Sequence, residues 1–164
     1  MTVSEFARQA LLNDGFPARR VTTIQNGIPL DRYRRQEGNG FRKQWNLPLD
    51  ARRVGCVGRL TAWKGQELFL ALAEARGRMN STEHFVVVGQ AFNEDQLFEQ
   101  TLRNRASESG LGKRVHFIPF QNDIIPAMSS LDVVIHTSLR PEPFGRVIIE
   151  AMALGVPVIA ARAG

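Results

Sequence analysis

The sequence is poor in cysteine, with Cys56 alone among 164 residues. A single thiol cannot close an internal disulfide, and it cannot supply the clustered cysteines of a structural zinc site. Folding must therefore depend on the burial of apolar side chains, for which the 43% hydrophobic content is sufficient. We expect one domain of moderate size in a reducing compartment, most simply the cytoplasm.

Long hydrophobic runs are also missing. The apolar run Val156–Ala161 is far shorter than the roughly 20 residues that cross a bilayer, and polar residues interrupt the N-terminus where a signal peptide would be apolar. We therefore expect no export and no membrane span. The arginine-rich opening leaves peripheral contact with the inner membrane face open, although it forms no convincing basic amphipathic anchor.

Several cofactor motifs are absent as well. The sequence has no G-x-G-x-x-G, which removes the main support for a nicotinamide dinucleotide, and no Asp-x-Asp. His84 and His116 do not have metal-ligand spacing. We expect no metal and no cofactor.

Charge is in excess on one side, with 21 Lys and Arg against 16 Asp and Glu. A basic balance suits phosphates, nucleic acid or an acidic membrane surface, and the sign alone does not choose among them. No aromatic-basic pattern of the known nucleic-acid-binding modules occurs, so nucleic acid is the weakest of these partners.

The chain divides into an irregular first part and a regular second part. Apolar spacing predicts a helix over Ser4–Asn13, and a β-branched run predicts a strand over Val21–Ile24. Residues 31–52 are polar and indicate a surface linker that holds at most a short helix over Phe41–Trp45. From residue 53, apolar runs alternate with amphipathic stretches, which is typical of βαβ units.

The second part predicts an α/β fold, a Rossmann-like parallel sheet of about five strands with helices on both faces. The expected strands are Val54–Val57, Phe85–Val88, Val115–Ile118, Val133–His136 and Val156–Ala160. The expected helices are Lys64–Arg78, Glu94–Ser109, Ile124–Ser130 and Phe144–Leu154. Ligands of such sheets bind outside the carboxyl ends of the strands.

Two groups of residues follow these strand ends. Gly58-Arg59 after the first strand and Lys64-Gly65 before the next helix combine two cations with unpaired helix amides, which suits a diphosphate. Near the end of the chain, Glu142 precedes a helix that carries Glu150, and Gly145 lets a ligand approach the first amides. The plainer alternatives are that the cations are solvated, that Glu142 only favours the helix N-terminus, and that Glu150 is a solvated helix residue.

Glu142 and Glu150 form an E-x7-E motif, which resembles that of the retaining GT-B glycosyltransferases. The surrounding Glu-Pro-Phe-Gly, Glu-Ala-Met-Ala and Gly-Val-Pro-Val resemble glycosyltransferase family 4 (group 1). The resemblance implies that residues 1–30 end an N-terminal domain and cross into the next, that 31–52 link them, and that 53–164 form a nucleotide-sugar-binding domain truncated at its C-terminus.

The resemblance also implies a role for each matching residue. Glu142 would contact the transferred sugar and be catalytic, Glu150 would accept from the ribose hydroxyls, and Arg59 with Lys64 would neutralise the diphosphate. The full set implied to bind the donor is Gly58, Arg59, Lys64, Phe120, Gln121, Asp123, Glu142, Phe144, Gly145, Arg146 and Glu150. For Arg146 only the backbone amide is assigned. His136 ends a predicted strand and could border the site, although a packed or partly exposed strand-end histidine is the favoured interpretation.

The function implied is transfer of a sugar from a nucleotide-diphosphate sugar to an acceptor with retention of configuration, in glycan biosynthesis. The acceptor, a sugar or a lipid-linked glycan, would bind mainly through the missing domain, so this chain alone should be inactive. A sugar-nucleotide epimerase of the same architecture and a non-catalytic nucleotide-binding module are the alternatives.

Overall fold

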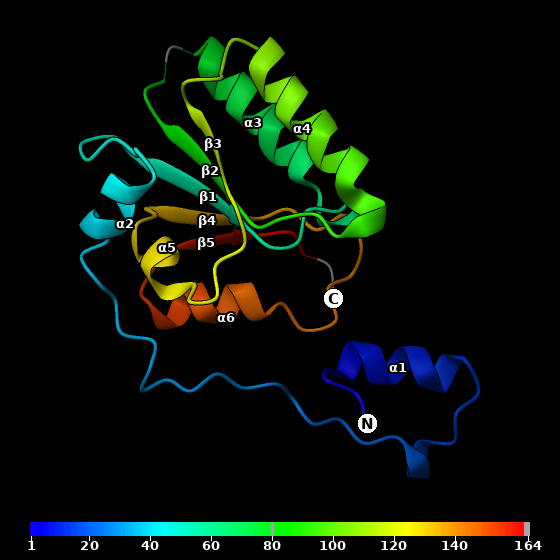
Figure 1. The fold of residues 1–164 in the computed structure, drawn as a ribbon. Coiled ribbons are helices and arrows are strands. Elements are labelled where there is room, and N and C mark those ends of the chain that lie inside the picture. Colours follow the sequence, from blue (N-terminus) through cyan, green and yellow to red (C-terminus); the bar gives the residue numbers. More distant parts are fainter. Residues whose placement is uncertain (80, 163–164) are drawn as a thin grey trace.

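The protein is described here from a computed structural model, which describes residues 1–79 and 81–162; the expected domain end at position 164 lies outside the described residues. A parallel five-stranded sheet forms its centre, in the order β3-β2-β1-β4-β5 (Figure 1). The strands are β1 (Arg53–Val57), β2 (His84–Val88), β3 (Val115–Ile118), β4 (Val133–His136) and β5 (Val158–Ala160). The predicted fold class is confirmed.

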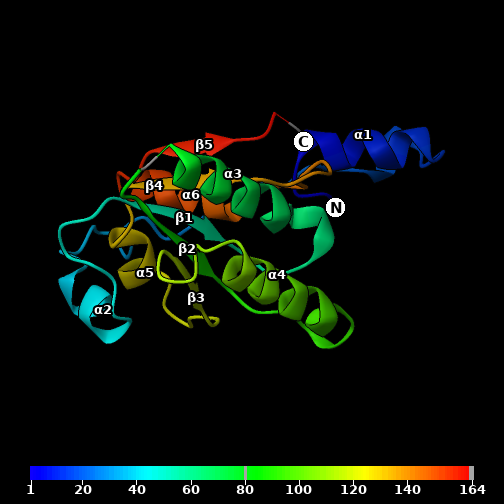
Figure 2. The same ribbon diagram turned by 90° about the horizontal axis from the view of Figure 1, so that it is seen from above.

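Helices cover both faces of the sheet, as Figure 2 shows from above. On one face lie α3 (Gln66–Arg78) and α4 (Gln96–Glu108), and on the other α2 (Asn39–Gln44), α5 (Ile125–Ser129) and α6 (Arg146–Ala153). Alternate residues of β2 point to opposite faces: Phe85 packs with the α3 side, and Val86 packs with the α5 and α6 side. Two apolar cores result, one on each face of the sheet.

Three helices begin two residues later than the sequence predicts. For α4 the expected start at Glu94 is wrong, because Asn93–Asp95 form a 3₁₀ turn and the α-helix begins at Gln96. The expected starts at Lys64 and Phe144 are wrong, because α3 begins at Gln66 and α6 at Arg146. The residues just before them, Gly65 and Gly145, have φ of 71° and 77°, which an α-helix does not accommodate. Each glycine is thus the N-cap, and the chain turns sharply before the helix.

The last strand is also shorter than predicted. The Val156 amide donates to the Ala151 carbonyl (2.9 Å) and closes the end of α6, and Pro157 has no amide to give to the sheet. Pairing with β4 therefore begins only at Val158.

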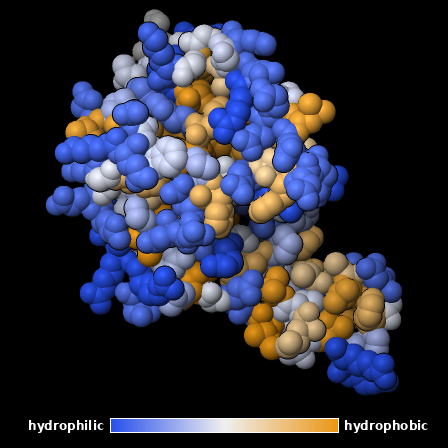
Figure 3. Space-filling view, viewed as in Figure 1, coloured by the Kyte–Doolittle hydropathy of each residue, from blue (hydrophilic) through white to orange (hydrophobic). Residues whose placement is uncertain are grey.

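The first part of the chain stands apart from the sheet. It holds α1 (Glu5–Asn13), begun by a Ser4 hydroxyl cap, and a 3₁₀ turn at Ala18–Arg20 (Figure 1). The predicted strand over Val21–Ile24 is reduced to a single parallel bridge between Thr2 and Thr23. Apolar side chains gather on the surface of this lobe, which lies at the lower right of Figure 3. None of the helices described here is long and apolar enough to cross a membrane.

The segment expected as a surface linker is only partly on the surface. Phe41 of α2 and Leu47 are buried in the core beneath β4 and α5. Gly38 allows this approach, since a Cβ on it would lie 2.8 Å from the Ser130 Cα atom. The second half of 31–52 therefore belongs to the core of the sheet domain, because its two apolar side chains cover an apolar face.

Candidate functional site

A cavity of about 450 Å³ opens at the carboxyl ends of β1, β2 and β3, beside the first turns of α6. Three loops after these strands, one face of α6 and Tyr33 from the connection before α2 form its wall. Its lining includes Gly58, Arg59, Gly89, Gln90, Phe92, Phe120, Gln121, Asn122, Tyr33, Arg146, Val147 and Glu150. The position agrees with the rule that parallel sheets bind ligands outside their strand ends.

The loop after β1 is held in place from two sides. The buried Gln66 side-chain amide donates to the Arg59 carbonyl (2.8 Å), and the Gly58 amide donates to the Val88 carbonyl (3.0 Å). Gly89 lies so close that a Cβ would be 2.0 Å from the Gly58 carbonyl oxygen, at φ +146°. The backbone is thereby fixed, while the Arg59 side chain is exposed at the cavity.

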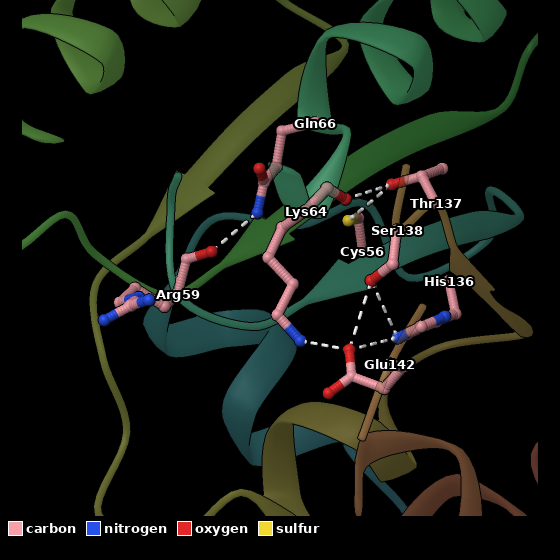
Figure 4. Close-up of polar contacts among 8 residues, drawn as sticks. All are labelled: Cys56, Arg59, Lys64, Gln66, His136, Thr137, Ser138 and Glu142. Carbon is pink, nitrogen blue, oxygen red and sulfur yellow. Dashed lines mark hydrogen bonds and ion pairs between the residues drawn. The ribbon is translucent and has the colours of Figure 1, made fainter. Parts of the chain in front are cut away.

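A second cluster lies where the strand order reverses, between β1 and β4. The Lys64 ammonium pairs with the Glu142 carboxylate at Oε2, as Figure 4 shows. Ser138 Oγ donates to the same oxygen (3.2 Å), and His136 Nε2 lies 3.3 Å from it. Burial by itself raises the pKa of Glu142, but Lys64, with Ser138 and His136, outweighs this effect and keeps the pKa below its usual range.

The backbone that carries Lys64 is locked against the segment after β4. Thr137 Oγ1 donates to the Lys64 carbonyl (2.9 Å), and the Leu139 amide donates to the Trp63 carbonyl (2.8 Å). A Cβ on Gly65 would lie 2.1 Å from the Thr137 carbonyl oxygen. The Lys64 and Glu142 segments, 78 residues apart in sequence, thus form one rigid corner.

Glu150 is buried on α6 and held by two donors. The Tyr33 hydroxyl donates to its Oε1 (3.0 Å), and the Arg146 guanidinium donates to the same atom (3.0 Å). Burial, followed by the hydrogen bond with the Glu150 carboxylate, raises the pKa of Tyr33. Neither contact uses Oε2, so this oxygen can accept a hydrogen bond from a hydroxyl group of a ligand.

The structure divides the predicted residues into two neighbouring groups. Gly58, Arg59, Phe120, Gln121, Arg146 and Glu150 line the cavity. Lys64 and Glu142 form the adjacent cluster, where Gly145 is the buried N-cap of α6. Phe144 is half-buried before α6 and is not among the lining residues.

Asp123 has a different position from the one predicted. Its Oδ1 accepts from the Ile125 amide (3.0 Å) and so supports the start of α5, and it does not line the cavity. The neighbouring Asn122 lines it instead. An aspartate two residues before a backbone amide commonly makes this turn, which was the sequence signal for the structural role.

Tyr33 and His136 are two residues of the site whose contacts the sequence did not predict. Tyr33 lies in the expected linker, and only the folded chain brings it within reach of Glu150. His136, for which a packed or partly exposed position was favoured over one that borders the site, contacts both Glu142 and Ser138. Its place at the end of a strand was the one available signal, since strand ends face the site. Among the described residues, no group of three or more His, Cys, Asp or Glu could hold a metal ion.

Comparison with known proteins adds a family relationship. Residues 39–164 match the family model described as glycosyl transferases group 1. The chain is 32% identical over 161 residues to D-inositol 3-phosphate glycosyltransferase of Mycobacterium tuberculosis (strain ATCC 25618 / H37Rv), which covers 96% of this chain and 32% of that protein. The chain therefore spans about a third of the length of this relative.

Solved structures resemble the whole of the chain. Anabaena Alr3699/HepE in complex with UDP and glucose superposes with a TM-score of 0.91 at 33% identity, covering 99% of this chain and 44% of that one. The same Anabaena protein is also known with UDP-glucose. The C-terminal domain of LpcC, a group 1 family protein from Francisella tularensis, gives a TM-score of 0.71 at 29% identity over 84% of this chain and 72% of that one.

Proposed function

The chain belongs to the group 1 glycosyltransferase family, and from this membership we propose that it supplies the donor-binding site of an enzyme that transfers a sugar from a nucleotide-diphosphate sugar. The observation that carries the proposal is that the cavity lies beside the Lys64–Glu142 cluster. A buried carboxylate, Glu150, lies in the cavity, and Lys64 and Glu142 lie beside it. Such a site matches a ligand with hydroxyls at both ends and a diphosphate between.

The nucleoside end of the donor occupies the cavity in this proposal. Glu150 accepts a ribose hydroxyl through Oε2, because Tyr33 and Arg146 both use Oε1. The base lies near Phe120 and Gln121, two residues of the loop after β3. We take UDP as the first nucleotide to test, because the similar Anabaena protein is known in complex with UDP and with UDP-glucose.

The diphosphate lies between the cavity and the Lys64–Glu142 cluster. Transfer breaks the bond between the anomeric carbon and the phosphate oxygen, which keeps the electron pair, and the acceptor oxygen bonds to that carbon and gives up its proton. Negative charge grows on the departing diphosphate, so cations and helix amides fixed around it lower the barrier. Arg59, Lys64 and the first amides of α6 serve this role, and the proposal includes no metal or other cofactor.

The sugar lies at Glu142, which is the catalytic residue of the proposal because it contacts the transferred group. The E-x7-E spacing from Glu142 to Glu150 supports retention of configuration and membership of family 4. We further propose that residues 1–30 end an N-terminal domain that provides the acceptor site for a sugar or lipid-linked glycan. A cytoplasmic enzyme in peripheral contact with the inner membrane face agrees with such an acceptor.

The test is calorimetric titration of the intact protein with UDP, UDP-glucose and a panel of other nucleoside diphosphates and nucleotide sugars. Arg59→Ala and Glu150→Ala should weaken binding of a nucleoside diphosphate by about tenfold or more, as expected for losing a charged hydrogen-bond partner. Glu142→Ala should abolish transfer and weaken mainly the nucleotide sugar. Arg78→Ala and Glu108→Ala, both at exposed positions away from the cavity, are the matched controls.

Four results would contradict the proposal. Absence of binding to every nucleotide, or site variants that bind and transfer like the parent, would exclude a donor site here. Inversion of configuration at one carbon of the nucleotide-bound sugar, without transfer to an acceptor, would indicate an epimerase. Binding without either reaction in the intact protein would indicate a nucleotide-binding module.

A further inference from the structure

His136 is the last residue of β4, and its side chain is only 6% exposed. Its Nε2 atom lies 3.3 Å from Glu142 Oε2 and 3.2 Å from Ser138 Oγ (Figure 4). His136, Ser138 and Lys64 thus surround a single carboxylate oxygen, Oε2 of Glu142. A strand-end histidine that only filled space would not need its polar edge turned toward that oxygen.

The direction of these hydrogen bonds follows from the chemistry of the partners. A lowered pKa keeps Glu142 ionised, and an ionised carboxylate can only accept hydrogen bonds. His136 Nε2 therefore carries a hydrogen, and the Ser138 hydroxyl also donates to the carboxylate. The Nδ1 atom of His136 is buried without a hydrogen-bond partner in the described part of the chain. The Nε2 atom is thus the one through which the imidazole acts.

All the protein contacts of the Glu142 carboxylate that the structure describes are made at Oε2. The second oxygen, Oε1, makes none among the described residues, and Figure 4 shows it directed away from the three donors. One oxygen thus anchors the side chain, and the other is available to a sugar hydroxyl.

The donors at Oε2 are not equivalent. Lys64 is the cation that the proposed function assigns to the diphosphate, so a bound donor draws its ammonium toward phosphate oxygens. His136 ends the core strand β4, Ser138 lies two residues beyond it, and the two residues are 7% and 4% exposed. Among the described residues, Glu142 is the one anionic group that these two side chains contact, so they continue to hold it when Lys64 turns to the diphosphate.

We propose that His136, assisted by Ser138, is a positioning residue that keeps the Glu142 carboxylate directed at the sugar of the bound donor. The inference rests on the proposed function, since it assigns the sugar to Glu142. It distinguishes the two ends of the donor: His136 acts on the sugar end only, and the nucleoside and diphosphate have their own partners in Glu150, Arg59 and Lys64.

The experiment compares UDP with UDP-glucose as probes of the intact protein. His136→Leu keeps the approximate volume and removes the donor; we expect about tenfold weaker binding of UDP-glucose, the size of losing one hydrogen bond to a charged group. Binding of UDP should stay within about twofold. His136→Gln restores an N–H donor near the position of Nε2 and should recover most of the lost affinity. His116→Leu, on β3, is the matched control.

A double-mutant cycle tests whether His136 acts through Glu142. In a Glu142→Gln background, the loss caused by His136→Leu should shrink to about twofold or less, because the anchored carboxylate is gone. Ser138→Ala, which removes only one hydroxyl, repeats the comparison if His136→Leu fails to fold. Retained binding of UDP reports that each variant is folded.

The outcomes separate this inference from the proposed function. If the parent binds neither probe, the proposed function fails. The positioning role is overturned if the parent binds both probes and the single variants His136→Leu and Ser138→Ala each weaken binding of UDP and of UDP-glucose equally, or leave both affinities unchanged. The donor site then stands. A loss of affinity that is selective for UDP-glucose, and that His136→Gln recovers, supports the positioning role.

Discussion

At the scale of single residues, Tyr33 orients the Glu150 carboxylate by donating a hydrogen bond to it. Tyr33→Phe removes the hydroxyl that donates to Glu150 Oε1 (3.0 Å) and leaves Arg146 as the partner there. We expect affinity for UDP and UDP-glucose to fall by the same factor, about three- to tenfold, or about 1 kcal/mol. Calorimetry on both ligands checks this. A loss confined to UDP-glucose, or no loss, would contradict the assignment of Glu150 to the nucleoside end.

Two other histidines make stability depend on pH. His84 Nδ1 lies 2.9 Å from His116 Nε2, and burial lowers the pKa of both from 6.5. As the pH falls below about 6.5, the two histidines bind protons in the unfolded chain before they do so in the folded chain. The folded state therefore loses stability as the pH falls. We expect the free energy of unfolding in urea to drop between pH 7.5 and 5.5. The drop should be smaller in the double variant His84→Gln with His116→Gln; equal slopes would disprove the cause.

At the scale of elements, the start of α3 depends on Gly65. Gly65→Ala combines an unfavourable φ of +71° with a Cβ 2.1 Å from the Thr137 carbonyl oxygen. Gly110→Ala is the matched control, because its φ is +72° and nothing lies within 4 Å of the added Cβ. We expect urea unfolding to show a loss of about 1 kcal/mol for Gly110→Ala and about 3 kcal/mol or more for Gly65→Ala.

The same substitution should also reach the site. The segment after β4 must move to accept the new methyl group, and this segment holds both the Lys64 carbonyl and the Ser138 side chain near Glu142. Gly65→Ala should therefore weaken binding of UDP-glucose, whereas Gly110→Ala should leave it unchanged. Equal stabilities of the two variants would show that the contact between these segments is looser than the structure indicates.

At the scale of the whole molecule, a donor that bridges several strand-end loops should stabilise the fold. UDP at about one hundred times its Kd adds about 2.7 kcal/mol, which for a domain of this size raises Tm by roughly 5 to 10 °C. We expect the same rise in EDTA and in MgCl₂, because the proposed diphosphate site uses Arg59, Lys64 and α6 in place of a metal ion. Thermal unfolding monitored by circular dichroism measures it. A rise that disappears in EDTA would require a bound cation.

The sequence by itself determined the α/β fold. Short runs rich in valine and isoleucine, such as Phe85–Val88 and Val133–Ile135, favour buried strands, and the amphipathic stretches between them favour helices that cover the sheet. It also predicted part of the cavity lining, such as Arg59 and Gln121, because residues that follow parallel strands meet at one edge whatever the details of packing. Helix starts were less certain, since a glycine such as Gly145 reveals its left-handed conformation only in the folded chain.

The tertiary structure alone decided which side chains meet. Tyr33 and Glu150 are 117 positions apart, and Lys64 and Glu142 are 78 apart, so no local periodicity connects either pair. Their contacts depend on how the connection before α2 packs under the sheet and on how tightly the α3 start approaches the end of β4. Hydrogen bonds act over about 3 Å, and a sequence pattern places residues only on a face or at an edge. The fold could therefore be inferred from the chain, whereas the anchoring of Glu142 by His136 could not.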